Sequence, residues 1–152
     1  MLSSRARYAT RALLDLSLQY PSGPILIQDI SDRQKVPLKY LQQILLDLKL
    51  AGFLTSRKGP GGGYSLARPP EEITLGQVLT AIDGADVDLS CNVSSNFNEC
   101  GCPVPSACSL RGAFIEVTKA MMVVLNETTF ADLRDQQRLA NEGQVKILNY
   151  TI

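Results

Sequence analysis

The sequence predicts a mainly α-helical protein with a small β-hairpin wing: a winged helix-turn-helix domain followed by a long dimerisation helix. Three observations support this fold class. Three segments with helical periodicity lie before residue 52. Two short β-like runs then flank residues 58–63, of which four are glycine, so a wide hairpin tip is expected there. Residues 106–126 are apolar around most of a helix, which requires burial on two sides.

The first helix is expected over residues 5–20, with Ser3 or Ser4 as its N-cap. The Pro-Ser-Gly-Pro sequence at residues 21–24 ends it, and a short helix follows over residues 27–34. The face of the first helix that points to the core is formed by Ala9, Ala12, Leu13 and Leu16.

The third helix is expected to start with Pro37, whose missing N–H costs no hydrogen bond in a first turn, and to stop at Gly52. Its buried stripe consists of Leu41, Ile44, Leu45 and Leu48. The outer side of its first two turns then presents Lys39, Tyr40, Gln42 and Gln43. Helix-turn-helix proteins insert this part of the second helix into the major groove, where Gln pairs with adenine and Lys reaches guanine or phosphate. These four residues are therefore candidate DNA contacts, and an ordinary solvated helix face is the alternative.

The predicted hairpin pairs residues 53–57 with residues 64–68. Arg57 and Lys58 lie beside a tip in which glycines allow the backbone to approach another molecule closely. A basic wing of this kind suits the minor groove or the phosphate backbone. A nucleotide phosphate loop is the alternative, but it requires a helix after the glycines, and strand-like residues follow them instead. The candidate glycine contacts are Gly61, Gly62 and Gly63.

In the second half, Thr74 and Gln77 have the spacing of a capping box and open a helix that ends at Gly84. Residues 85–109 are expected to form a long loop, residues 130–139 a short amphipathic helix, and residues 145–152 could add an edge strand. The long helix over 106–126 has a heptad seam and further apolar residues outside it, so a second copy of the chain is its expected partner. A central helix in a monomer is the alternative. The seam consists of Leu110, Phe114, Val117, Met121 and Val124.

Charge divides the chain into two halves. Residues 1–68 contain ten basic and four acidic residues, a net charge of +6, whereas residues 69–152 contain five basic and eleven acidic residues, a net charge of −6. Only the first half is therefore expected to meet a polyanion such as double-stranded DNA. No apolar run has the length of a membrane span or a secretory signal, so we expect a cytoplasmic protein without membrane contact.

Four cysteines, Cys91, Cys100, Cys102 and Cys108, lie within eighteen residues, and the chain has no histidine. In a reducing cytoplasm such a group indicates a metal or redox site more often than a disulfide framework. Thiolates alone can hold an iron–sulfur cluster of the 2Fe–2S or 4Fe–4S type. A four-cysteine zinc site and a metal-free thiol/disulfide switch are the alternatives.

Five stretches of the sequence resemble a known family: Arg7-Tyr8-Ala9, Asp29-Ile30-Ser31, and residues 40–44, 48–54 and 59–64. The sequence is similar to the Rrf-type (Rrf-two) family of bacterial winged-helix transcription regulators, which includes regulators of iron–sulfur clusters and of cysteine metabolism. The resemblance covers roughly residues 1–135, and the Gly-Pro-Gly-Gly-Gly-Tyr sequence at 59–64 is its most specific part. It implies a homodimer crossed through the long helix, with two winged domains on a near-palindromic operator. The implied DNA contacts are Lys39, Tyr40, Gln42, Gln43, Arg57 and Lys58, the last standing where Arg is common in the family.

The resemblance also implies three cluster-binding cysteines, for which Cys91, Cys102 and Cys108 are the best match. The interval between the first two is longer than in the cluster-binding members. Those members place a histidine three residues after the third cysteine, where this chain has Arg111. Others take a carboxylate from the N-terminal region of the partner subunit, where this chain has arginines at positions 5, 7 and 11. We therefore expect Cys100 as the fourth ligand, with Glu99 as a weaker candidate.

These expectations divide the chain into a winged helix-turn-helix DNA-binding domain (1–70), a connecting helix with a cysteine-rich sensor loop (71–109), and a dimerisation helix with a C-terminal segment (110–152). The predicted function is a dimeric transcription regulator that senses iron–sulfur or redox status. The alternative is a cluster-free regulator controlled by a thiol switch or by a protein partner. An enzyme with a small-molecule substrate is not expected, because the chain lacks histidine, a nucleotide loop and a paired-carboxylate motif.

Overall fold

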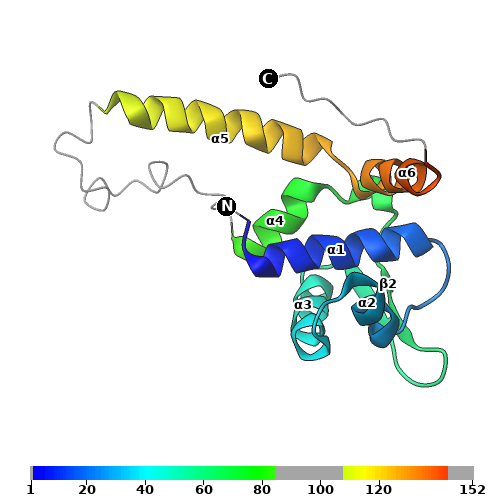
Figure 1. Ribbon diagram of the computed structural model, residues 1–152. Coiled ribbons are helices and arrows are strands. Elements are labelled where there is room, and N and C mark those ends of the chain that lie inside the picture. The colour runs from blue at the N-terminus through cyan, green and yellow to red at the C-terminus, as the bar shows by residue number, and fades with distance from the viewer. Residues whose placement is uncertain (1, 85–107, 144–152) are drawn as a thin grey trace.

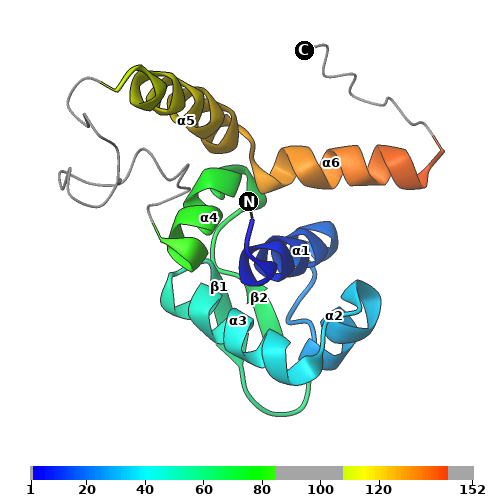
Figure 2. The same ribbon diagram turned by 60° about the vertical axis from the view of Figure 1, so that its left-hand side comes forward.

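The computed structural model describes residues 2–84 and 108–143. Within these ranges the chain is mainly α-helical and carries one antiparallel two-stranded sheet, which confirms the predicted fold class. Figures 1 and 2 show α3 and the hairpin on one side of the molecule, and α5 and α6 on the opposite side. In chain order the elements are α1 (Ser4–Gln19), α2 (Ile27–Gln34), α3 (Leu38–Leu50), β1 (Leu54–Arg57), β2 (Gly63–Leu66), the 3-10 helix η1 (Pro70–Glu72), α4 (Leu75–Asp83), α5 (Ser109–Glu127) and α6 (Phe130–Asn141).

The helix-turn-helix unit is formed by α2, α3 and the turn between them. Lys35 has a φ of 52°, a left-handed conformation that ends α2 and redirects the chain. The Ser31 hydroxyl donates to the Val36 carbonyl at 2.7 Å and fixes the turn. Pro37 was expected inside the first turn of α3. It is instead the N-cap residue, because its backbone is extended (ψ 128°) and the helix begins at Leu38.

The wing is shorter and begins later than the sequence indicated. Phe53 precedes β1 because its N–H is bonded to the Leu48 carbonyl at the end of α3, at 2.9 Å. Gly63, expected in the tip, is the first residue of β2 and pairs with Arg57. The second strand ends at Leu66 rather than at residue 68.

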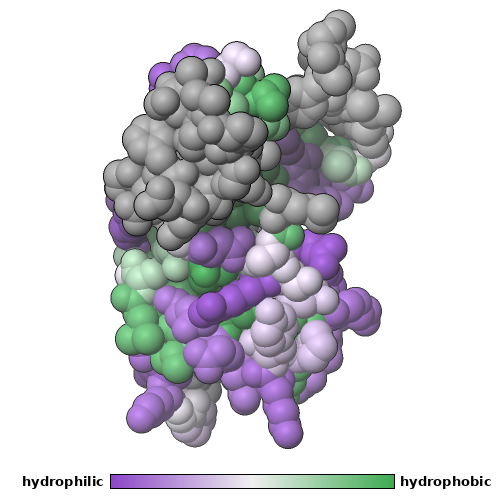
Figure 3. Space-filling view, turned by 90° about the vertical axis from the view of Figure 1, so that its left-hand side faces the viewer, coloured by the Kyte–Doolittle hydropathy of each residue, from purple (hydrophilic) through white to green (hydrophobic). Residues whose placement is uncertain are grey.

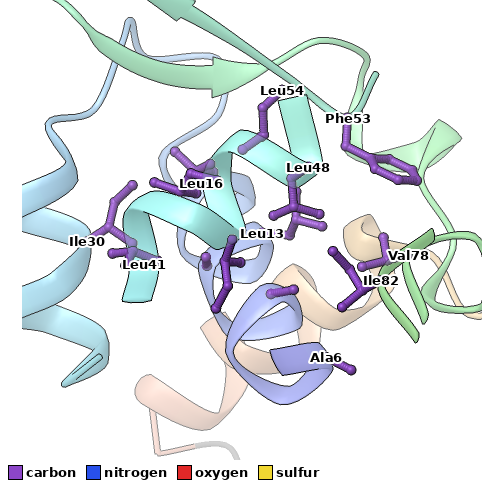
Figure 4. Close-up of a cluster of buried hydrophobic side chains, with 14 of the residues drawn as sticks. Ala6, Leu13, Leu16, Ile30, Leu41, Leu48, Phe53, Leu54, Val78 and Ile82 are labelled. Carbon is purple, nitrogen blue, oxygen red and sulfur yellow. The ribbon is translucent and has the colours of Figure 1, made fainter. Parts of the chain in front are cut away.

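One hydrophobic core joins the helix-turn-helix to the hairpin and to α4. Figure 4 shows Leu13 and Leu16 of α1, Leu41 and Leu48 of α3, and Val78 and Ile82 of α4 gathered around the same interior. The predicted stripes of α1 and α3 are all buried, so each amphipathic pattern identified the correct face. Phe130, the first residue of α6, is also fully buried in this core.

The second half follows the predicted elements with adjusted ends. Thr74 and Gln77 form the predicted capping box at the start of α4. The long helix begins at Ser109 rather than at 106, because Cys108 has an extended backbone and is its N-cap residue. A second capping box, between Thr129 and Asp132, opens α6 and was not predicted. The expected loop lies almost entirely, and the expected edge strand over 145–152 entirely, outside the described residues.

The junction between α5 and α6 is bonded to the segment that begins α4. The Leu75 N–H donates to the Thr128 carbonyl and the Phe130 N–H donates to the Ile73 carbonyl, both at 2.9 Å. Helix α6 then lies against α1, where Arg138 donates to the Leu18 carbonyl at 3.3 Å. The C-terminal end of α5 is therefore held to the domain that carries the helix-turn-helix.

Helix α5 differs from the other described α-helices, each of which has buried residues. It contacts α4, yet none of its nineteen residues is buried. Figure 1 shows it extending away from the rest of the described fold. In the described ranges, no helix has the length and apolarity to cross a membrane.

Candidate nucleic-acid interface

The outer face of α3 presents the residues that the sequence singled out. Lys39, Tyr40, Gln42 and Gln43 are all exposed, because the stripe on the opposite side of the helix is buried in the core. Leu46 and Leu50 are also exposed and continue the same face at the spacing of a helical stripe. Sequence reasoning missed these two leucines because it followed only the first two turns. The candidate face therefore combines polar groups with an apolar end.

Tyr40 is supported by aromatic and cationic groups of α1. Its ring meets the Tyr8 ring edge to face, with centroids 5.7 Å apart. The guanidinium groups of Arg7 and Arg11 each lie 5.8 Å from the Tyr8 ring centroid. Arg11 also donates to the main-chain carbonyl of Gln34 at the end of α2. Tyr8 thus links the first helix to α3, and Arg11 links it to α2.

Gln43 belongs to a second link between α3 and α1. Its side-chain amide nitrogen Nε2 donates to Asp47 Oδ1 at 3.1 Å, one turn further along the helix. The other oxygen of that carboxylate, Oδ2, accepts from Arg5 Nη2 of α1 at 2.5 Å. Neither Arg5 nor Asp47 was predicted to take part, since they lie 42 positions apart and only the packing of α1 on α3 brings them together.

The hairpin presents its basic residues at the tip. Arg57 and Lys58 are exposed, as is Gly61, which has a φ of 70°. Lys49, near the end of α3, donates to the Ser56 hydroxyl of β1 at 2.6 Å, so its charge lies between the helix and the wing. In Figure 3 hydrophilic side chains project from the lower end of the molecule, where α3 and the hairpin lie in Figure 1.

Gly62 and Gly63, the other two predicted glycine contacts, determine the shape of the wing through their backbone contacts. Gly62 is buried, and its N–H donates to the Gly59 carbonyl at 2.9 Å. Gly63 lies against Ile25, where an added Cβ would collide with the Ile25 carbonyl. Beside it, Ile25 and Tyr64 exchange two backbone hydrogen bonds of 2.8 Å each, which fasten the wing to the segment between α1 and α2.

The cysteine site is described at one residue only. Cys108 is half-buried and unpaired with another cysteine, and it precedes the first turn of α5. Cys91, Cys100 and Cys102 lie outside the described residues, as does Glu99. Arg111, in the position where histidine was considered, is half-buried in the first turn of α5. Among residues 2–84 and 108–143 no group of three potential metal ligands occurs.

The chain matches the protein-family model described as "Rrf2: Iron-dependent Transcriptional regulator" over residues 2–136. It is 39% identical over 146 residues to Protein rrf2 of Nitratidesulfovibrio vulgaris, which covers 96% of this chain and 95% of the relative. It is 35% identical over 136 residues to the HTH-type transcriptional regulator IscR of Serratia proteamaculans, covering 90% of this chain and 80% of the relative.

Solved structures show the same architecture. The global cysteine regulator CymR of B. subtilis superimposes with a TM-score of 0.72 at 25% identity, covering 89% of this chain and 96% of that chain. IscR of T. potens superimposes with a TM-score of 0.71 at 27% identity, covering 95% of this chain and 91% of that chain. The described fold is therefore that of winged-helix regulators.

Proposed function

The chain belongs to the Rrf2 family of transcriptional regulators, and on this premise we propose that it is a homodimer that binds operator DNA and senses iron–sulfur or redox status through its cysteines. The proteins and solved structures that it resembles are regulators such as IscR and CymR. The chain therefore acts as a regulator and not as an enzyme.

One observation carries the DNA-binding part of the proposal: the polar face of α3 and the basic hairpin tip lie on the same side of the molecule, opposite α5 and α6 (Figures 1 and 2). In this arrangement α3 enters the major groove with Lys39, Gln42 and Gln43, while Tyr40 lies at its edge against Tyr8. Arg57, Lys58 and the exposed Gly61 follow the adjacent backbone or minor groove. Gly62 and Gly63 contribute by holding the tip in shape.

The exposed apolar surface of α5 supports the dimer. Leu110, Val117 and Val124 are each more than half exposed on a helix with no buried residue, and they share the predicted heptad seam. A second copy of the same helix would cover this seam with a matching one. Because residues 128–130 are bonded to the segment that begins α4, and α4 packs against α1, the dimer contact would also set the distance between the two α3 helices. That distance must match half-sites about one helical turn apart.

The donor set of the cysteine segment suits an iron–sulfur cluster. We assign Cys91, Cys102 and Cys108 as ligands and Cys100 as the fourth, because no histidine exists in the chain. Cys108 is the N-cap residue of α5, so the cysteine segment joins the dimer helix directly at one of its proposed ligands. A bound cluster would supply a centre that responds to oxidants and to iron supply. Cys108 would transmit the state of the segment to the dimer helix.

A cluster-free regulator is the second candidate. The structural similarity to CymR favours it, since that protein is described as a cysteine regulator. In this case Cys100 and Cys102 would exchange between thiol and disulfide, or the cysteines would be secondary to a protein partner. A four-cysteine zinc site is a third use of the same ligands.

The test is anaerobic purification followed by iron, sulfide and zinc analysis and by DNA binding. We expect iron and sulfide in stoichiometric amounts, and their loss in single Cys→Ala variants at positions 91, 100, 102 and 108. Operator affinity should differ between loaded and cluster-free protein, and it should fall steeply with salt because phosphate contacts release counterions. Equal operator affinity of the cluster-loaded and the cluster-free protein would refute the proposal that the cysteine site controls DNA binding. A full cluster in Cys100→Ala would refute the fourth ligand.

A further inference from the structure

Gln43 is held in one orientation on the exposed face of α3. Its amide nitrogen Nε2 donates to Asp47 Oδ1 at 3.1 Å. Because the amide group is planar, turning the nitrogen toward Asp47 turns the carbonyl oxygen Oε1 away from it. Among the described residues, no hydrogen-bond donor contacts Oε1. Gln43 therefore offers a fixed acceptor together with the second N–H of the same amide.

Asp47 is in turn held by α1. Arg5 Nη2 lies 2.5 Å from Asp47 Oδ2, and the Asp47 side chain is only 19% exposed. Each carboxylate oxygen thus has its own donor, one from α1 and one from Gln43. The Arg5 guanidinium also balances a negative charge that would otherwise stand beside a surface meant for phosphates. The order of the network is Arg5, then Asp47, then Gln43.

We propose that Arg5 and Asp47 are positioning residues for base recognition, and that the base read by Gln43 is adenine. The fixed Oε1 would accept from the exocyclic amino group N6, and the remaining N–H of Nε2 would donate to N7. Cytosine offers an amino donor in the major groove but no neighbouring acceptor, so it would satisfy only half of this pattern. The inference rests on the proposed function, because it assumes that α3 lies in the major groove.

Pre-ordering explains why such a network matters. A free glutamine side chain must lose rotamer freedom when it pairs with a base, whereas a side chain already held by Asp47 has lost it in the unbound protein. Removing the support should therefore weaken the specific contact by about two- to tenfold. It should leave the phosphate contacts unchanged, since these depend on other side chains.

The experiment begins with duplexes that the wild-type protein enriches from a random double-stranded library. Each position of the enriched half-site is then replaced by the other three bases, and binding is measured for wild type, Gln43→Ala, Asp47→Ala and Arg5→Met. We expect Gln43→Ala to lose discrimination at one position, which carries adenine. Asp47→Ala should lose discrimination at that same position without losing affinity for a non-specific duplex, because the released Arg5 charge can only favour phosphate. A probe with 7-deazapurine in place of that adenine lacks both the N6 amino group and the N7 acceptor, and it should bind all three α3 and α1 variants equally.

Two further variants separate positioning from charge and folding. Arg5→Lys keeps a cation and should retain most of the discrimination that Arg5→Met loses. Lys119→Met also removes one positive charge, but Lys119 pairs with Glu116 on α5 and not with Asp47, so it should leave discrimination intact. Two results for Asp47→Ala would overturn the inference: full discrimination, or an equal loss of discrimination at every position. A base other than adenine at the position that Gln43→Ala affects would also overturn it. Failure of the wild type to enrich any duplex would instead refute the proposed function.

Discussion

Arg33 of α2 donates two hydrogen bonds to the carboxylate of Asp15 of α1, Nε to Oδ1 at 2.9 Å and Nη2 to Oδ2 at 2.8 Å. Gln34 Nε2 adds a third donor to Oδ1 at 3.0 Å. The Asp15 side chain is 3% exposed and that of Arg33 is 40% exposed, so the anion is buried and the cation reaches solvent. The hydrogen bonds that Arg33 donates to Asp15 raise the pKa of Arg33 above its ordinary value. The pair fastens the first helix of the helix-turn-helix to α1.

Replacing Arg33 by Met should destabilise the protein by about 1–3 kcal/mol, because it leaves a buried carboxylate with one neutral donor. The figure is below that of a fully buried pair because Arg33 is partly solvated. Urea denaturation followed by circular dichroism measures the change. The double variant Arg33→Met with Asp15→Leu should recover stability, because no unpaired charge remains. A single variant as stable as the wild type would contradict the assignment.

Gly63→Ala should damage the wing more than Gly61→Ala does. Both glycines have positive φ, 145° and 70°, so alanine at either costs about 1–2 kcal/mol of backbone strain. Only at Gly63 does the new Cβ also meet the Ile25 carbonyl, whereas Gly61 faces open space. Thermal unfolding should therefore show the larger loss for Gly63→Ala, accompanied by weaker DNA binding. Equal losses in the two variants would show that the contact with Ile25 does not constrain the wing.

The attachment of α6 should weaken in acid. Hydrogen bonds from the Thr129 hydroxyl and backbone lower the pKa of Asp132 below its ordinary value of about 4. A lowered pKa in the folded state contributes stability that is complete above the ordinary pKa and is lost as pH falls through the lowered one. The stability difference between wild type and Asp132→Asn should therefore shrink below about pH 4. Glu142→Gln, at the other end of α6, is the control, and a pH-independent difference for Asp132→Asn would contradict the prediction.

Charge on the exposed seam of α5 should prevent dimer formation without unfolding the winged domain. Val117→Asp and Val124→Asp place a carboxylate where two apolar helices would meet, and neither valine is buried in the single chain. Light scattering after size exclusion should show monomers, with helix content near that of the wild type. Lys119→Asp also alters charge on this helix but lies outside the seam, and it should remain dimeric. Dimers in both valine variants would place the contact elsewhere.

Most secondary structure was readable from the sequence because its signals are local. The stripe at Leu41, Ile44, Leu45 and Leu48 predicted the buried face of α3, and the spacing of Thr74 and Gln77 predicted the start of α4. The errors were also local: Pro37 and Cys108 are caps rather than helical residues, and Gly63 belongs to a strand. In each case neighbouring backbone bonds decided a boundary that composition alone leaves open.

The candidate site was recognised in part. Exposure of Lys39, Tyr40, Gln42 and Gln43 followed directly from the buried stripe on the other side of the helix. Lys49 and Asp47 were passed over because their partners, Ser56 and Arg5, come from other elements. The ligand assignment of Cys91, Cys100, Cys102 and Cys108 stays a prediction, as do the DNA contacts.

The sequence by itself determined which segments are helices or strands, which faces of α1 and α3 are buried, and which residues the outer side of α3 therefore exposes, since periodicity, caps and glycine positions act over a few residues. The tertiary structure decided how those residues are supported: Arg5 on Asp47, Arg33 on Asp15, Ile25 on Tyr64, and α6 on α1. The reason is physical. A side chain acquires a distant partner only when the core brings two elements together, and that packing is a property of the whole fold.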